Sequence, residues 1–163
     1  MSAVLQDLLI RLDDLSDPRI EAFMQEHLVD MYAVSPPESV HALDMDQLRQ
    51  PHIAFWSAWL PTADGDDMLV GTGALKRLDA GHAELKSMRT STRHRGQGIA
   101  RQLLNHLLQE ARARGFARVS LETGTQPFFE PARQLYFQHG FVECGPFADY
   151  GLDPSSFFMT RTL

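Results

Sequence analysis

Residues 93–100 combine cationic side chains with glycines, in the order Arg-His-Arg-Gly-Gln-Gly-Ile-Ala. Glycines let backbone N–H groups converge on one point at low steric cost. The stretch runs into an amphipathic segment, residues 101–114, so these N–H groups would lie at the positive end of a helix dipole. Such a turn favours an anion, and a phosphate group is its natural guest.

The charges of the chain are unevenly distributed. The net charge is −6, but residues 1–50 hold ten acidic against three basic side chains, whereas residues 85–118 hold eight basic side chains and one Glu. A net-negative protein is a poor general nucleic-acid binder, and one local basic region suits a small polyanion. We therefore expect no nucleic-acid partner. Solvated helix faces of opposite sign remain the alternative reading.

Length and composition suit one domain over residues 1–163, because 44% apolar residues are ample for a packed core. The single Cys144 cannot form an internal disulfide, and the seven His lack ligand-like spacing, so no metal site is expected. Charged residues such as Asp7, Arg11 and Asp13 interrupt the N-terminal apolar run, and no stretch reaches membrane-spanning length. These features predict a cytoplasmic protein with no membrane partner.

Residue patterning predicts the elements that would position the basic turn. Helices are expected over residues 17–33, 45–49, 101–114 and 132–139, and strands within residues 4–12 and over 53–60, 69–75, 82–90, 118–122, 141–144 and 156–163. The strand, turn, helix and strand around the glycines form a crossover unit, so its two strands should be parallel. The earlier strands follow one another through short turns and should be antiparallel.

Two motifs resemble those of the Gcn5-related N-acetyltransferases (GNAT). The first, Arg/Gln-x-x-Gly-x-Gly/Ala, is present at residues 95–100, and the second, Ala-x-x-Leu-Tyr-x-x-x-Gly-Phe, at residues 132–141. The glycine motif alone recurs by chance, but both motifs in order are specific, and the resemblance covers residues 53–145. It implies an α/β fold of the α+β type: a mixed, mostly antiparallel central sheet flanked by helices, with a parallel strand pair splayed at the acetyl-CoA site.

The resemblance implies acetyl-CoA as the acyl donor. Backbone N–H groups of residues 95–100 would cradle the pyrophosphate, while residues 88–90 would pair with the pantetheine arm like an added strand. Met88 would offer its N–H to the thioester carbonyl oxygen. The implied cofactor-binding residues are Met88, Arg89, Thr90, Arg95, Gly96, Gln97, Gly98, Ile99, Ala100 and Arg101.

Transfer to an amine needs a base and an acid, because an alkylammonium has no lone pair and the departing thiolate must gain a proton. By position in the family pattern, Glu84 matches the base and Tyr136 the acid. Glu84 precedes Met88 by four residues, so regular pairing would place both side chains on one face of the strand. Alternatively, Glu84 only pairs with a cation and Tyr136 is only a core aromatic.

The acceptor is expected to be a primary amine of a small molecule that attacks directly in a ternary complex. Candidate acceptor-binding residues are Glu38, His41, Glu122 and Thr123, with Arg89 and Tyr150 as further candidates. A turn or surface role for Glu38 and His41 is the alternative. A protein acceptor, at an N-terminus or a lysine, and a non-catalytic acyl-CoA sensor also remain open. Phe129 gives the sensor some support, because many members have Asn there. A homodimer is possible.

Overall fold

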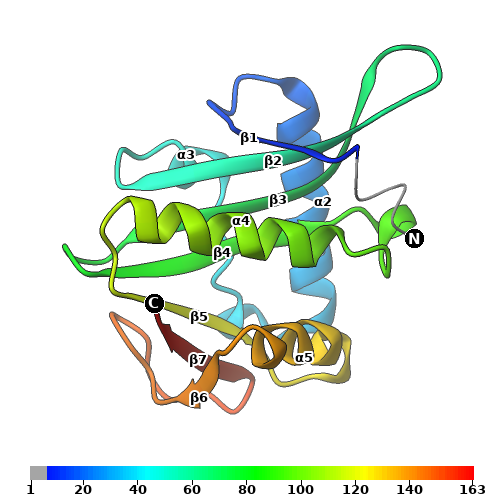
Figure 1. The fold of residues 1–163 in the computed structure, drawn as a ribbon. Helices are drawn as coiled ribbons and strands as arrows, with labels where there is room; N and C mark the ends of the chain where they lie inside the picture. Colours follow the sequence, from blue (N-terminus) through cyan, green and yellow to red (C-terminus); the bar gives the residue numbers. More distant parts are fainter. Residues whose placement is uncertain (1–6) are drawn as a thin grey trace.

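The structure, a computed structural model, describes residues 7–163 as one seven-stranded sheet in the order β1-β2-β3-β4-β5-β7-β6 (Figure 1). The strands are β1 (Leu9–Leu12), β2 (Ile53–Pro61), β3 (Asp67–Arg77), β4 (His82–Thr90), β5 (Arg118–Gly124), β6 (Val142–Cys144) and β7 (Ser156–Thr162). Among these described strands, β4 and β5 form the one parallel pair, and the other neighbours are antiparallel. The mixed, mostly antiparallel sheet predicted from the sequence is confirmed.

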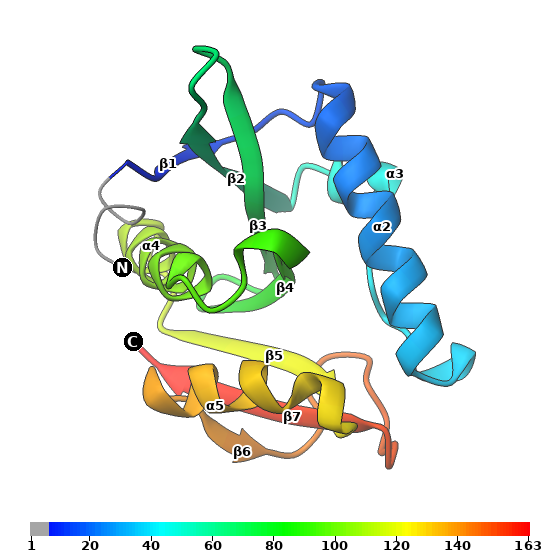
Figure 2. The same cartoon turned by 90° about the vertical axis from the view of Figure 1, so that its right-hand side faces the viewer.

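Helices cover both faces of this sheet. They are α2 (Pro18–Val34), α3 (Met45–Leu48), α4 (Ile99–Ala113) and α5 (Glu130–Gln138), with short 3-10 helices η1 (Pro37–Ser39), η2 (Thr92–His94) and η3 (Pro127–Phe129). Figure 2 shows α4 and α5 on one side of the sheet and α2 and α3 on the other. Each side has its own buried apolar cluster, one around α4 and one around α2. The sheet therefore has an α4 face and an α2 face.

The start and end of α2 follow from local chemistry. The Asp17 side chain accepts a hydrogen bond from the Arg19 backbone N–H at 2.9 Å, and Pro18 occupies the first helical position. The helix ends at Val34, and Ser35 after it is extended, because a residue before a proline disfavours the helical conformation. The predicted helix over residues 17–33 is confirmed within one residue at each end.

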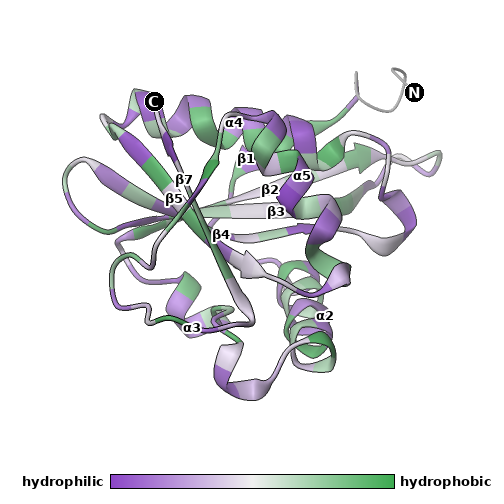
Figure 3. Cartoon of the chain, turned by 90° about the horizontal axis from the view of Figure 1, so that it is seen from below, coloured by the Kyte–Doolittle hydropathy of each residue, from purple (hydrophilic) through white to green (hydrophobic). Residues whose placement is uncertain are grey.

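Helix α4 is amphipathic and packs closely on β3. Figure 3 shows hydrophobic and hydrophilic residues alternating along it, and its buried side chains are Ile99, Leu103, Leu104, Leu107, Leu108 and Ala111. Two glycines of β3 allow the close approach. A Cβ on Gly71 would lie 2.6 Å from Leu103 Cδ1, and one on Gly73 would lie 2.5 Å from Leu107 Cδ1. This packing holds the start of α4 beside the end of β4.

A β-bulge interrupts the pairing of β3 with β4. Ala74 lies opposite Lys86, but Thr72 lies opposite Arg89, so β4 has one residue more than β3 between these pairs. Ser87 takes up the extra residue with a positive φ of 57°. A bulge of this kind bends a strand and re-aims the side chains that follow it.

The bulge changes which side chains share a face of β4. Cross-strand partners point to the same side of a sheet, so Glu84 and Arg89, opposite Lys76 and Thr72, both face α2. Met88 faces α4, because its Sδ lies 2.9 Å from where a Cβ on Gly73 would be. The expectation that Glu84 and Met88 share a face is therefore wrong, since it assumed regular pairing.

The remaining boundaries differ from the predictions by a few residues. Strand β3 extends two residues beyond the predicted 69–75 at each end, and β5 continues to Gly124. The first strand was predicted within residues 4–12 and is found at Leu9–Leu12, while residues 4–6 lie outside the described part. Over residues 7–163, no helix is both long and apolar enough to cross a membrane.

Candidate active site

Strands β4 and β5 pair over only three residues each. The paired residues are His82 with Arg118, Ala83 with Val119, and Glu84 with Ser120. Both strands continue beyond these pairs, β4 to Thr90 and β5 to Gly124. The strands therefore splay apart after Glu84, and one edge of each faces an opening rather than a neighbouring strand.

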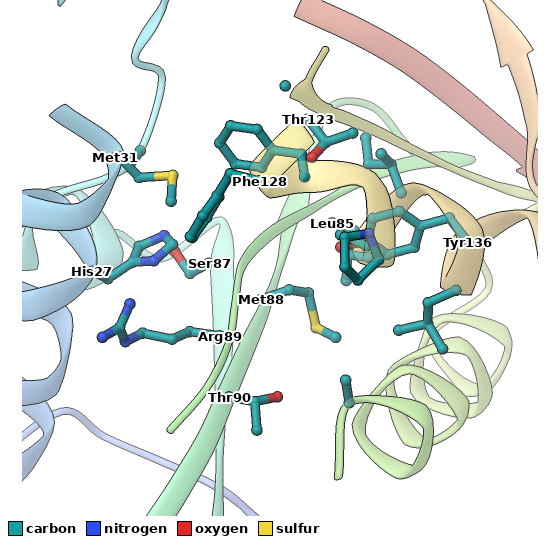
Figure 4. Close-up of a pocket in the computed structure, with 18 of the residues that line it drawn as sticks. His27, Met31, Leu85, Ser87, Met88, Arg89, Thr90, Thr123, Phe128 and Tyr136 are labelled. Atoms are coloured by element: carbon teal, nitrogen blue, oxygen red, sulfur yellow. The ribbon is translucent and has the colours of Figure 1, made fainter. Parts of the chain in front are cut away.

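A cavity of about 860 Å³ occupies this opening. Residues 85–90 of β4, residues 121–124 of β5, the start of α4 and residues of α5 line it, and α2 with residues 39–42 closes the other side. In Figure 4, Met88, Leu85 and Tyr136 lie on the α4 and α5 side, whereas Arg89, Ser87 and His27 lie toward α2. The cavity thus joins the two faces of the sheet and has the size of a small-molecule site.

The α4 end of the cavity is built from the glycine turn. Gly96 and Gly98 have φ values of 77° and 85°, and no side chain caps the helix that begins after Gly98. The first N–H groups of an α-helix have no partner within the helix, so this end presents backbone donors. The lining includes Met88, Arg89, Thr90, Arg95, Gly96, Gly98, Ile99, Ala100 and Arg101, whereas Gln97, also predicted from the sequence, is not part of it.

Two arginines attach this end to its surroundings. Arg101 Nη2 donates to Gln138 Oε1 at 3.1 Å, which connects the start of α4 with the end of α5. The Arg95 guanidinium lies over the Phe128 ring, 5.7 Å from its centre. Both cations belong to residues that line the cavity, so the region beside the free N–H groups is positively charged.

Tyr136 lies where α5 meets the cavity. Its side chain is buried, and its ring packs edge-on against Phe141. Burial raises the pKa of the Tyr136 hydroxyl above its ordinary value. The hydroxyl therefore stays protonated at neutral pH and can act as a proton donor.

Glu122 is the titratable carboxyl group on the β5 side of the cavity. Burial raises the pKa of Glu122 to about 7, and the nearby Glu84 adds to the shift while Lys86 opposes it. A carboxyl group with this pKa exchanges its proton near neutral pH, which is the range that a general base requires. Glu122 was predicted from the sequence as an acceptor-binding residue. Its raised pKa was not predicted, because it depends on burial in the folded chain.

Glu84 lies behind the cavity wall and is 1% exposed. Its Oε2 accepts hydrogen bonds from the Tyr150 hydroxyl and from Lys86 Nζ, the latter at 3.2 Å. Lys86 Nζ also donates to the Tyr150 hydroxyl at 2.9 Å. Lys86 lines the cavity and Glu84 does not. Glu84 thus has a cation partner, Lys86, as expected for its alternative, structural role.

His27 is a cavity residue that sequence reasoning missed. It is buried on the inner face of α2, one turn after Phe23 and Met24. Burial, together with the charge of Arg89, lowers the pKa of His27 to about 4, so the imidazole is neutral. A polar residue at an apolar position of the helical repeat was the signal in the sequence.

The predicted acceptor residues are only partly brought together. His41 and Thr123 line the cavity with Glu122, whereas Glu38, in η1, does not. The His41 ring packs edge-on against Tyr150 at 5.0 Å, and burial lowers the pKa of His41, with Lys86 adding to the effect. Over residues 7–163, no group of three or more His, Cys, Asp or Glu side chains could hold a metal ion.

Sequence comparison agrees with this geometry. The profile of the Acetyltransferase (GNAT) family matches residues 20–141. The chain belongs to this family. The N-acetyltransferase YsnE of Bacillus subtilis is 53% identical over 154 residues, 94% of this chain and 99% of YsnE. YedL of Escherichia coli, also an N-acetyltransferase by name, is 50% identical over 94% of both chains.

Structural comparison finds the same fold in acyltransferases. A Klebsiella pneumoniae protein described as an acyl-CoA N-acyltransferase matches with a TM-score of 0.77 and 27% identity, over 96% of this chain and 97% of that one. A GNAT protein of Elizabethkingia anophelis with acetyl-CoA bound shares the fold at a TM-score of 0.63 and 16% identity, over 96% and 99% of the two chains. The protein is thus an acyltransferase of the GNAT family, which uses acetyl-CoA.

The residues present fit acetyl-CoA. The uncapped start of α4 offers backbone donors beside the cations of Arg95 and Arg101, as a pyrophosphate requires. The free edge of β4 after Glu84 offers an extended backbone to a pantetheine arm. These two features adjoin one cavity, so the donor set matches both parts of the molecule.

One departure from the GNAT pattern has a visible structural consequence. Phe129 stands where many members have Asn, and its ring packs against the backbone of Gly124 at the end of β5. A Cβ on Gly124 would lie 2.1 Å from Phe129 Cδ2, so glycine is needed there. Both residues line the cavity. The Phe129 ring therefore makes this part of the cavity wall apolar.

Proposed function

We propose that this protein transfers the acetyl group of acetyl-CoA to a primary amine of a small molecule, by direct attack in the cavity between β4 and β5. The observation that carries the proposal is the early end of the β4–β5 pairing at Glu84 and Ser120. It opens one cavity that reaches from the start of α4 to Glu122. A donor and an acceptor can therefore meet there from opposite faces of the sheet.

In this proposal the glycine turn, residues 95–101, holds the pyrophosphate, and residues 88–90 hold the pantetheine arm. When bound, acetyl-CoA supplies the activated acetyl group. The backbone N–H of Met88, next to the bulge at Ser87, is our candidate donor to the carbonyl oxygen of the thioester. A donor at this position stabilises the negative charge that develops on that oxygen during attack.

We assign the role of general base to Glu122. Its carboxyl group lines the cavity, and its pKa of about 7 lets it take a proton from an ammonium group near neutral pH. Glu84, the base implied by the family resemblance, is bonded to Lys86 and Tyr150 behind the wall. In our scheme Glu84 acts on Glu122 through its charge, which favours the protonated form of Glu122.

We assign the role of general acid to Tyr136. Its hydroxyl belongs to a residue of the cavity wall and stays protonated because burial raises its pKa. It lies on the α4 and α5 side, where the leaving thiolate would depart (Figure 4). Base and acid thus stand on opposite sides of the splay, so that one can take the proton of the amine and the other can protonate the leaving thiolate.

The function is tested by a screen of amines with acetyl-CoA that measures free thiol, alongside isothermal titration with acetyl-CoA. We expect micromolar binding and CoA release above the hydrolysis background with at least one small amine. Binding of acetyl-CoA, with no amine causing release of CoA, would indicate the acyl-CoA sensor instead. Release only with peptides would indicate a protein acceptor, and no binding at high micromolar concentration would refute the proposal. Homodimerisation and a cytoplasmic location remain predictions.

A further inference from the structure

Three buried polar atoms on the α2 side of the cavity share an unusual property. His27 Nδ1, Ser87 Oγ and Arg89 Nε have no hydrogen-bond partner among residues 7–163. Figure 4 shows the three side chains together on one wall, and all three residues line the cavity. Buried polar groups in native proteins nearly always have a partner. This wall is therefore built to bind a polar group that the chain itself does not supply.

The chemistry of the wall is that of a hydrogen-bond donor. Arg89 is 8% exposed, and its Nη1 donates to Asp30 Oδ2 at 2.8 Å, which fixes the orientation of the guanidinium group and leaves the Nε–H unused. The Ser87 hydroxyl can donate a second hydrogen bond, and the neutral imidazole of His27 has one ring N–H. Asp30 is 36% exposed, so solvent screens its charge more than that of Arg89. An oxyanion satisfies these donors best.

We propose that the acceptor is an amino acid, whose carboxylate binds Arg89, Ser87 and His27 while its amine faces Glu122. This proposal rests on the proposed function. It deepens that function by giving the acceptor a second charged group besides the reacting amine. It also gives His27 and Arg89 a role in acceptor specificity.

One cavity holds both groups that an amino acid needs. Ser87 and Arg89 line it from β4, and Glu122 lines it from β5. The bulge at Ser87 brings Lys86 and Arg89 opposite Ala74 and Thr72, which are only two residues apart in β3, or about 7 Å. The donors and the carboxyl group are therefore within reach of one small molecule.

Apolar side chains lie beside His27 on this wall. Figure 4 shows Met31 and Phe128 close to His27, and Val40 and Phe129 also line the cavity. Polar residues of the lining include Ser39, His41 and Lys86. The apolar group beside His27 favours an acceptor with an apolar side chain.

The test compares three acceptors: phenylalanine, phenylalaninamide and phenethylamine. They differ only in the group on the carbon that bears the amine, which is a carboxylate, a neutral amide or a hydrogen atom. Free-thiol release gives kcat and KM for each with saturating acetyl-CoA. We expect kcat/KM for phenylalanine to exceed that for the other two by at least tenfold. In Arg89→Gln, KM for phenylalanine at saturating acetyl-CoA should rise at least tenfold more than KM for phenethylamine, and titration with acetyl-CoA measures any change in donor binding separately. Arg112→Gln, the same change at an exposed position outside the cavity, should leave all constants unchanged.

The outcomes separate this inference from the proposed function. If all three acceptors react equally well, or if Arg89→Gln weakens them to the same extent, the carboxylate site is refuted and the transferase stands. If none of these amines, and no amine of the wider screen, releases CoA, the proposed function fails. Should Arg89→Gln not fold, Arg89→Lys keeps the cation without the Nε–H and must raise KM for phenylalanine more than KM for phenethylamine. A KM unchanged in that variant would overturn the inference.

Discussion

Glu84 and Ser120 are the last two residues that β4 and β5 pair, although β4 runs on to Thr90 and β5 to Gly124. The Ser120 hydroxyl forms hydrogen bonds to both neighbouring strands, 2.6 Å from His82 Nε2 of β4 and 2.8 Å from Thr160 Oγ1 of β7. Beyond this point no backbone ladder joins the two strands. The position of the cavity therefore follows from where this pairing ends.

Gly98→Glu should abolish acetyl-CoA binding. Gly98 precedes the uncapped start of α4. A carboxylate at this position would accept hydrogen bonds from the free N–H groups of the helix and would repel a pyrophosphate. Isothermal titration measures the loss, expected to be at least 100-fold in Kd. Gly98 has a φ of 85°, so any other side chain also strains the backbone, and Gly98→Ala is the control for strain. Equal Kd values for the Glu and Ala variants would contradict the assignment.

Tyr136→Phe should preserve acetyl-CoA binding and lower turnover. The hydroxyl is the only group removed, and the ring still packs against Phe141. General acid catalysis typically contributes about 10²–10⁴-fold, so a fall in kcat within that range is expected. Steady-state rates at saturating acetyl-CoA measure the effect, and titration checks binding. A kcat equal to that of the wild type would remove Tyr136 from the mechanism.

Gly73→Ala should destabilise the fold by about 1–3 kcal/mol, the usual cost of overpacking a core. The new methyl group would lie 2.5 Å from Leu107 Cδ1 and 2.9 Å from Met88 Sδ, so α4 or Met88 must move. Urea unfolding measures the change in the free energy of unfolding. Gly145→Ala is the matched control, because no atom lies within 4 Å of its added Cβ. Equal unfolding free energies for the two variants would contradict the close packing of α4 on β3.

The sequence predicted most elements because their signals are local. Asp17 and Pro18 mark the start of α2, and the apolar repeat from Leu103 to Ala111 marks the inner face of α4. The parallel pairing of β4 and β5 followed from the crossover between them, and it is confirmed. Family resemblance located the glycine turn and the helix of Tyr136.

Which side chains share a face of β4 could not be predicted from local sequence. Ser87 adopts a positive φ without being a glycine, so no residue type signalled the bulge that separates Glu84 from Met88. The pKa of Glu122 depends on burial by distant segments, which no residue spacing reveals. His27 carried a weak signal, a polar residue on the apolar face of α2, but its unpaired Nδ1 depends on the packed structure.

The central claim is that Glu122 takes the proton from an amine in the splay between β4 and β5. The measurement that tests it is the pH dependence of kcat/KM for the amine in the wild type, Glu122→Gln and Glu84→Gln. Burial raises the pKa of Glu122 to about 7, and the base must be deprotonated, so kcat/KM should rise with pH through a midpoint near 7.

Glu122→Gln should abolish the rise of kcat/KM with pH and lower kcat/KM by about 10²–10⁴-fold. Glu84→Gln should keep this ascending limb of the pH profile. In Glu84→Gln the midpoint should move to lower pH, because the charge of Glu84 contributes to the raised pKa of Glu122. A limb that persists in Glu122→Gln and disappears in Glu84→Gln would contradict the account.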